Sequence, residues 1–170
     1  TSFSLICKDL SQVSDFTRPI DKSTFKLLKH NLPGPFTFLL PASNKIPHIY
    51  GSKKKVVGIR IPNNNIPLAI VEYNRANVFT NVNDLQRARS LYEKVAGIYH
   101  REGLEIAAAQ AEYSLAYLAF LEDDYSRATA ELERLADVFD RLGDVKSAAV
   151  TQLDLVEINV YLNQHGQAVL

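Results

Sequence analysis

The seven prolines of this sequence all lie between Pro19 and Pro67, and residues 68–170 contain none. Because proline ends or kinks a helix, only the second stretch can form long uninterrupted helices. Charge changes at the same place: residues 1–73 hold ten Lys and Arg against four Asp and Glu, and residues 74–170 hold nine against fifteen. We therefore place a boundary near residue 72, between a basic part and an acidic part.

The 170 residues are 46% hydrophobic, which is enough for one domain or two small ones. No apolar stretch approaches the roughly 20 residues that span a bilayer, and the chain does not open on a basic region followed by an apolar run. We expect a cytoplasmic protein. The single cysteine, Cys7, follows Leu5 and Ile6, so we expect it to be a small buried side chain.

Three short apolar runs in residues 1–71 have the composition of β-strands. They cover residues 3–7, 36–40 and 56–61, and the middle run is bounded by Pro35 and Pro41. Helical stretches alternate with them, which predicts a small α/β segment.

Two helices are predicted in this segment. The first is capped by Asp21, places Phe25, Leu28 and Leu32 on one face, and ends before Pro33. The second is capped by Asn65, with Pro67 in its first turn.

Three strings in this segment carry a family resemblance. They are Phe-Ser-Leu-Ile-Cys-Lys-Asp-Leu at 3–10, Leu-Pro-Gly-Pro-Phe-Thr-Phe-Leu at 32–39 and Val-Gly-Ile-Arg-Ile-Pro at 57–62. In this order and spacing, residues 2–71 resemble the middle part of the YrdC/YciO family of threonylcarbamoyl-AMP synthases. The family joins threonine, bicarbonate and ATP into an adenylate used in tRNA modification, and some members are described as binding double-stranded RNA.

The resemblance implies that Thr37 and Arg60 line a nucleotide and substrate cleft. A hydroxyl bonds phosphate or carboxylate oxygens, and a guanidinium holds either group with two hydrogen bonds. ATP and magnesium would be the cofactors in that case, and otherwise we expect none. The Lys-x-Arg and Ser-x-Ser-Ala-Asn strings of the family are absent, and we expect no metal site of the chain's own. We therefore expect binding rather than catalysis, and the enzymatic alternative stays open.

Lys53, Lys54 and Lys55 form a basic run that, with Lys45, suggests a patch for RNA. The alternative is a solvated loop before a strand. We favour the loop because the run has no interleaved aromatic residues.

Residues 72–170 repeat themselves with a period of forty. Glu72-Tyr73 aligns with Glu112-Tyr113, Arg87-Ala88 with Arg127-Ala128, and Gly103 with Gly143, and a third copy begins before the end of the sequence. Each copy predicts two helices, and in the second copy these cover about 105–122 and 125–142. Gly103 and Gly143 suit left-handed positions after a helix, Asp123-Asp124 a tight turn, and Ala76, Ala88, Ala116 and Ala128 close helix contacts.

This segment resembles the tetratricopeptide (TPR) repeat in a long-helix form. The resemblance implies a solenoid of helical hairpins whose first helices line a groove for a peptide or partner protein. Its groove positions would be Tyr73, Asn77, Thr80, Asn81, Tyr113, Tyr117, Phe120, Glu157 and Tyr161. Packing against the next helix is the alternative for these side chains, and for Phe120 it is the one we prefer. His100 and His165 lie alone, so no catalytic arrangement is predicted here.

The overall class is therefore α+β, with a partial YrdC-like segment at 1–71 and TPR-like repeats at 72–170. No linker separates them, and residues 66–82 predict one helix shared by both. The missing methionine and missing family strings favour a fragment or an engineered chimera. The main functional hypothesis is a non-catalytic interaction scaffold, which could self-associate through the unfinished repeat at 164–170. The alternative is an ATP-, threonine- or RNA-binding remnant of a threonylcarbamoyl-AMP synthase.

Overall fold

The computed structural model describes residues 4–46 and 56–167, with side chains up to residue 163. It divides into two compact units, Thr1–Leu68 and Ala69–Leu170. Helix α3 (Asn65–Asn81) runs through this division without a break. The predicted run Lys53–Lys55 lies outside the described residues.

The first unit contains a mixed three-stranded sheet. Its strands are β1 (Ser4–Ile6), β2 (Phe38–Pro41) and β3 (Val56–Arg60), in the order β1-β3-β2. Strand β3 is parallel to β1 and antiparallel to β2. The predicted strands are confirmed with ends moved by one or two residues, except that Pro41 pairs with Val56 and so belongs to β2 rather than bounding it.

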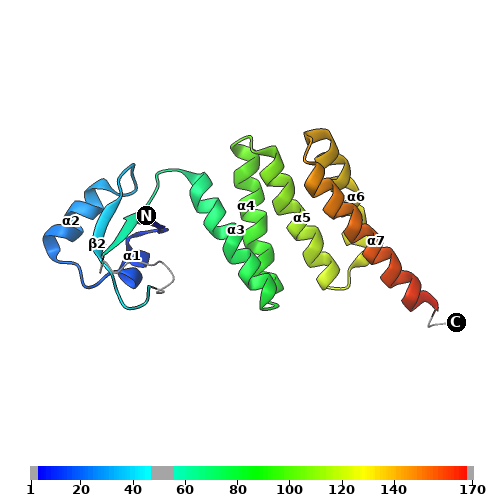
Figure 1. Cartoon of the computed structure of the whole chain (residues 1–170), viewed down its shortest axis with the longest axis horizontal. Coiled ribbons are helices and arrows are strands. Elements are labelled where there is room, and N and C mark those ends of the chain that lie inside the picture. The colour runs from blue at the N-terminus through cyan, green and yellow to red at the C-terminus, as the bar shows by residue number, and fades with distance from the viewer. Residues whose placement is uncertain (1–3, 47–55, 168–170) are drawn as a thin grey trace. The chain divides into compact units, whose positions relative to one another are not determined.

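Two helices, α1 (Leu10–Phe16) and α2 (Lys22–Asn31), complete this unit (Figure 1). Asp21 caps α2 by accepting hydrogen bonds from the backbone N–H groups of Ser23 and Thr24, both at 2.9 Å, as predicted. The sequence analysis did not anticipate α1, which Asp9 caps at 2.9 Å to the Gln12 N–H.

One face of this sheet and the two helices enclose a core. Its buried members are Cys7, Val13, Leu28, Leu32, Leu40, Val57, Ile59 and Ile61. The prediction that Phe25 shares the buried face was wrong, since its side chain is exposed. Leu28 and Leu32, on the same helix face, are buried as predicted.

The second unit is an array of helices stacked in chain order, each antiparallel to the one before (Figure 1). After α3 come α4 (Leu85–Arg101), α5 (Glu105–Leu121), α6 (Tyr125–Leu142) and α7 (Val145–Gln167). The helices predicted at 105–122 and 125–142 are confirmed. Asn64, rather than the predicted Asn65, accepts the hydrogen bond at the start of α3, at 2.8 Å from the Ile66 N–H.

Each turn between these helices contains one left-handed residue, and these residues recur every twenty positions. They are Asn83 (φ 58°), Gly103 (φ 69°), Asp123 (φ 62°) and Gly143 (φ 72°). A left-handed residue ends a helix and lets its last carbonyls accept hydrogen bonds from the turn. The forty-residue period of the sequence therefore contains two helices, each followed by a turn with the same backbone conformation.

Small residues let neighbouring helices approach closely. The four predicted for this role, Ala76, Ala88, Ala116 and Ala128, are all buried. Larger side chains of α6 fill the space beside them, with Leu132, Leu135 and Phe139 buried along one stripe.

Candidate functional site

In the first unit, Thr37 and Arg60 lie at the same end of the β2–β3 pair. Phe38 pairs with Ile59 in the antiparallel ladder, Thr37 directly precedes β2, and Arg60 is the last residue of β3. Both residues are exposed. Because side chains alternate along a strand and Ile59 belongs to the core, the Arg60 side chain belongs to the face of the sheet away from the core.

Backbone hydrogen bonds hold this end of the sheet in place. The Arg60 carbonyl accepts from the Cys7 N–H at 2.8 Å, and the Ile61 carbonyl accepts from the Gly34 N–H at 2.9 Å. Gly34 approaches the end of α2 so closely that a Cβ added there would lie 2.4 Å from the Asn31 carbonyl oxygen. Only glycine fits, so the turn that delivers Thr37 depends on it.

Apolar side chains cover the rest of this exposed face. Ile6 lies beside Arg60 in the parallel register, and Leu39 and Val56 lie toward the other end of the β2–β3 pair. Leu39 is 70% exposed. The sequence analysis missed this apolar surface, because strands without polar alternation indicate burial on both faces.

Cys7 is buried, as predicted. Burial, with a smaller effect from the nearby carboxylates of Asp9 and Asp15, raises the pKa of its thiol to about 11. The thiolate is therefore disfavoured, and Cys7 is a core residue rather than a nucleophile.

In the second unit, two tyrosines predicted for the groove tie first helices together. The Tyr73 hydroxyl lies 3.0 Å from the Ser114 hydroxyl oxygen, and Tyr113 donates a hydrogen bond to the Asp154 carboxylate. Both contacts join residues 41 positions apart, from α3 to α5 and from α5 to α7. Burial and then the hydrogen bond to Asp154 raise the pKa of Tyr113 well above its ordinary value.

A cavity of about 180 Å³ lies beside these tyrosines. It is lined by Tyr73, Gln110, Tyr113, Phe139, Lys146, Ser147 and Val150. Phenol, amide, ammonium and hydroxyl groups thus surround a small space between the first helices and α6.

Three other predicted groove residues and Tyr125, which was not predicted, form a row of aromatic rings. Tyr117, Phe120, Tyr125 and Tyr161 follow one another with ring centroids 5.9, 5.8 and 5.3 Å apart. Tyr117 is 40% exposed, whereas Phe120 packs against the core, as preferred from the sequence. The row therefore has exposed and structural members.

Asn77 and Thr80 face inward instead of offering free polar groups. Both contact the Tyr92 hydroxyl, at 2.6 Å from Asn77 Oδ1 and 3.2 Å from Thr80 Oγ1. Asn81 and Glu157 are exposed. In the first repeat, the groove positions are thus largely occupied by contacts within the protein.

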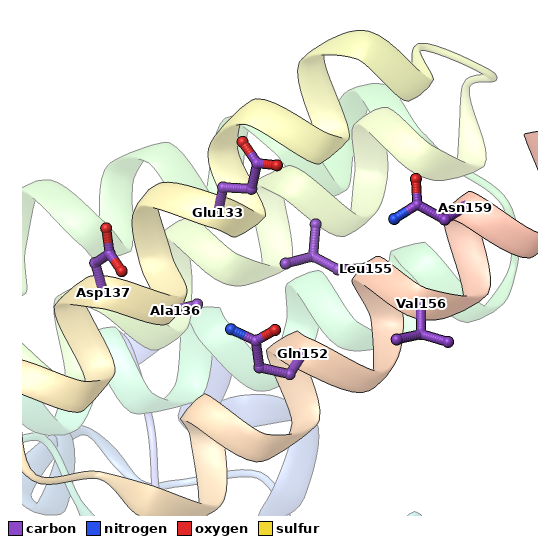
Figure 2. A pocket seen from close by; sticks show the side chains of 7 residues that line it. All are labelled: Glu133, Ala136, Asp137, Gln152, Leu155, Val156 and Asn159. Carbon is purple, nitrogen blue, oxygen red and sulfur yellow. The ribbon is translucent and has the colours of Figure 1, made fainter.

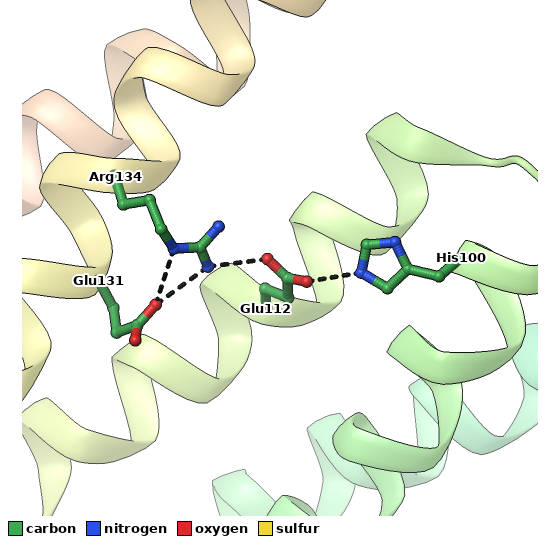
Figure 3. Close-up of polar contacts among 4 residues, drawn as sticks. All are labelled: His100, Glu112, Glu131 and Arg134. Carbon is green, nitrogen blue, oxygen red and sulfur yellow. Dashed lines mark hydrogen bonds and ion pairs between the residues drawn. The ribbon is translucent and has the colours of Figure 1, made fainter.

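In α3 and in α5, a carboxylate pairs with a cation of the following helix. Lys94 lies 3.4 Å from Glu72, and Arg134 lies 2.8 Å from Glu112, in equivalent positions of the two repeats. Figure 3 shows the second pair extended by His100, 2.6 Å from Glu112, and by Glu131, 3.0 Å from Arg134.

Burial alone would raise the pKa of Glu112, but the hydrogen bonds from Arg134 and His100 outweigh it and hold the pKa below its ordinary value. His100 therefore has a partner, although the sequence suggested that it stands alone. The arrangement binds three helices together and needs no substrate to explain it.

Among the side chains described, those of residues 4–46 and 56–163, no cluster of three or more His, Cys, Asp or Glu is placed to hold a metal ion. In the same part of the chain, no helix has the length and apolar character needed to cross a membrane.

Comparison with known proteins bears on the first unit. The sequence model of the Sua5/YciO/YrdC family, described as "Telomere recombination", matches residues 1–99. This chain belongs to that family. The match reaches beyond the boundary predicted near residue 72 and covers α3 and most of α4.

The similar proteins are bacterial. An uncharacterized protein of Haemophilus influenzae is 38% identical over 71 residues, which are 41% of this chain and 34% of that protein. The uncharacterized protein YciO of Escherichia coli is 38% identical over 72 residues, 42% of this chain and 34% of YciO. A threonylcarbamoyl-AMP synthase of Coxiella burnetii is 36% identical over 59 residues, 35% of this chain and 32% of the synthase. The chain therefore spans about a third of the length of the curated relatives it matches.

Proposed function

We propose that the first unit binds a ligand of the threonylcarbamoyl-AMP synthase type, either ATP or threonine, and that Thr37 and Arg60 contact its phosphate or carboxylate oxygens. The observation that supports this proposal is that Thr37 and Arg60 are both exposed and lie at the same end of the β2–β3 pair, directly beyond the Phe38–Ile59 pair. Family membership and the similar synthase of Coxiella burnetii support the same ligand class. The comparisons thus favour the alternative hypothesis of the sequence analysis over the interaction scaffold.

The chemistry of the two groups suits this ligand class. A guanidinium grips a carboxylate or a phosphate with two parallel hydrogen bonds, and a hydroxyl adds a third. Among the described residues, the Arg60 side chain has no hydrogen-bond or ion-pair partner that competes for it. Magnesium would enter with ATP, on the phosphates, and RNA remains a weaker candidate ligand.

Binding, rather than catalysis, is the activity proposed. Adenylation develops charge on several phosphate oxygens, and enzymes stabilise this charge with several cations. Arg60 is the one cation on the exposed face of the described strands. The family strings that would supply others are absent from the sequence.

Isothermal titration calorimetry with ATP–magnesium and, separately, with threonine tests the proposal. We expect saturable binding of at least one ligand. Arg60→Ala should weaken this binding about tenfold or more. Arg60→Lys should weaken it less, because lysine keeps the positive charge but cannot form two parallel hydrogen bonds with the ligand. Thr37→Val removes the hydroxyl at nearly constant volume. Arg18→Ala is the matched control, because Arg18 is also an exposed cation of this unit. The proposal fails if neither ligand binds at millimolar concentration, or if Arg18→Ala weakens binding as much as Arg60→Ala.

A second candidate function, binding of a peptide along the first helices of a TPR-like array, is favoured by one observation. Tyr117 is 40% exposed within the row of aromatic rings, and tyrosine is a frequent anchor in protein interfaces. A peptide array probed with the protein and with Tyr117→Ala tests it. Peptides that bind the wild-type protein should not bind Tyr117→Ala, and the circular dichroism spectra of the two proteins should be the same.

A further inference from the structure

A cavity of about 290 Å³ in the second unit is lined by residues of α4, α5 and α6. Its apolar lining consists of the buried Ala109 and the half-buried Val138 and Leu142. Charged or titratable residues of the three helices make up the rest. The volume is close to the lower end of the range of about 300–1,000 Å³ that is usual for small-molecule sites. The cavity therefore suits a small ligand with both apolar and charged groups.

Three of the polar lining residues are already occupied with one another. The carboxylate of Glu112 lies 2.6 Å from His100 and 2.8 Å from Arg134 (Figure 3). Arg134 also lies 3.0 Å from Glu131. The charge of Glu112 is thus balanced within the protein, and this part of the cavity needs no ligand to complete it.

Glu105 and Arg141 are two further lining residues, and their charges are not balanced. Glu105 precedes Glu112 by seven residues in α5. Arg141 follows Arg134 by seven residues in α6. Seven residues are about two helical turns, and the two helices are antiparallel, so both residues lie two turns from the Glu112–Arg134 pair in the same direction. Even so, Glu105 and Arg141 form no ion pair, either with each other or elsewhere in the described part of the chain.

The side chain of Arg141 keeps most of its donors for a ligand. Its Nε donates to the Asp137 carbonyl oxygen at 3.3 Å, which leaves the two terminal NH₂ groups of the guanidinium. A carboxylate accepts charge-assisted hydrogen bonds from such groups. Glu105 offers the complementary acceptor, because no donor among the described residues bonds its carboxylate oxygens.

We propose that this cavity binds a free amino acid with an aliphatic side chain, whose carboxylate contacts Arg141 and whose ammonium group contacts Glu105. The apolar lining contacts the side chain of the amino acid. A zwitterion pairs with both charges of the cavity at once, whereas a simple anion or cation would leave one of them unpaired. This site is separate from the one proposed in the first unit.

The forty-residue repeat supplies a comparison within the sequence. At the position of Glu105, the preceding first helix has Asn65 and the following one has Val145. Arg141 has an equivalent, Arg101, in the preceding repeat. A carboxylate near the start of a helix and a cation near the end of one each favour the helix dipole. That general role does not require both charges in the same repeat, and the two occur together at these positions in the second repeat but not in the first.

The larger groove between α6 and α7 lacks this combination of charges (Figure 2). It has a volume of about 350 Å³, and its described lining includes the carboxylates of Glu133 and Asp137 but no Lys or Arg. It therefore offers no cation for the carboxylate of an amino acid, and the cavity at Glu105 and Arg141 matches a zwitterion better.

Calorimetric titration of the full chain with L-leucine tests the proposal. Leucinamide keeps the ammonium group but lacks the carboxylate, like the N-terminal residue of a peptide. N-acetylleucine keeps the carboxylate but lacks the ammonium group, like the C-terminal residue of a peptide. We expect leucine to bind at least about tenfold more tightly than either analogue, because each analogue leaves one charged group of the protein without its hydrogen bonds.

Variants of the full chain then assign the two contacts. Arg141→Gln should weaken leucine binding about tenfold or more and remove the advantage of leucine over leucinamide. Glu105→Gln should weaken it similarly and remove the advantage over N-acetylleucine. A change in folding alone would not act on one analogue in each variant. Arg127→Gln and Glu133→Gln, at exposed residues outside the cavity, are the matched controls and should bind leucine like the wild type.

Several outcomes would overturn the proposal. It is wrong if leucine does not bind at millimolar concentration, or if the control variants weaken binding as much as Arg141→Gln and Glu105→Gln do. Equal or tighter binding of leucinamide or N-acetylleucine would identify one end of a peptide as the ligand instead. Loss of leucine binding in Arg60→Ala would place the amino acid in the first unit, which would overturn this proposal and support the function proposed for that unit.

Discussion

Tyr113 donates its phenolic hydrogen to the carboxylate of Asp154, so that α5 is tied to α7 across the array. The same construction joins Tyr73 to Ser114 one repeat earlier. Tyr73 and Tyr113, which the sequence analysis expected to bind a partner, therefore have structural roles within the protein.

Tyr113→Phe should lower the free energy of unfolding by about 1 kcal/mol, because it removes this hydrogen bond and leaves the half-buried Asp154 carboxylate without its donor. Urea unfolding followed by circular dichroism measures the change. Tyr117→Phe is the control, since no hydrogen bond of its hydroxyl is formed with the described residues. An equal loss in both variants would contradict the role given to Tyr113.

The raised pKa of Tyr113 predicts a dependence on alkaline pH. A group whose pKa is higher in the folded state stabilises the fold below its unfolded pKa, and this stability is lost as the pH rises above about 10. Urea midpoints measured from neutral to alkaline pH should therefore fall less steeply for Tyr113→Phe than for the wild type. Identical slopes would show that the tyrosine does not titrate differently on unfolding.

Glu112→Gln should make the protein less sensitive to acid. The pKa of Glu112 is held down in the folded state, so its contribution is present above the unfolded value of about 4.3 and is lost as the pH falls through the folded value. The variant should be destabilised at neutral pH and approach the wild type at acidic pH. Glu133→Gln, at an exposed carboxylate of the neighbouring helix, is the matched control, and an equal loss of stability at neutral pH in both variants would contradict the role given to Glu112.

The repeat provides its own control for packing. Ala109→Leu should cost about 1–3 kcal/mol of stability, because Ala109 is buried against α6 and has no room for a larger side chain. Ala149→Leu makes the same change forty residues later, where the site is exposed, and should leave stability within about 0.5 kcal/mol of the wild type. Similar losses at both positions would mean that the surface of α7 around Ala149 is covered.

Gly34→Ala should unfold or strongly destabilise the first unit, since the new methyl group would meet the Asn31 carbonyl at 2.4 Å. The comparison is Gly97→Ala, where the nearest atom is the end of the Arg101 side chain at 3.6 Å. Because Gly97 lies within α4, alanine there should stabilise the helix by about 0.5–1 kcal/mol. Hydrogen exchange of the amides of β2 and β3 would distinguish the two variants, and unchanged protection in Gly34→Ala would contradict the expected clash.

The parts of the fold that were predictable are those with local signals. Asp21 and Gly143 mark helix ends through their own side chain or backbone, and the forty-residue period places α5 and α6 to within one residue. Helix α1 was missed because seven residues hold too few turns to show a periodic pattern.

Contacts between distant residues were not predictable. The placement of Thr37 and Arg60 at the same end of the β2–β3 pair depends on the register of two strands separated by a long connection, and register has no local signal. Phe25 matches the period of α2 yet is exposed, because the period of a helix does not show how far a neighbouring element covers its apolar face. The bond from Tyr113 to Asp154 likewise depends on how far apart neighbouring repeats are stacked. The TPR resemblance and the chimeric origin remain predictions.

The left-handed residues at every twentieth position have a consequence for how such an array can change in length. Adding or removing one residue inside a helix rotates all later residues about the helix axis by about 100°, so that their buried side chains no longer face the neighbouring helices. The length of the array can therefore change without loss of packing only by whole helices, each with its own turn and cap. An array of this kind is expected to grow and shrink by duplication or loss of complete units, and its relatives should differ in helix number far more than in helix length.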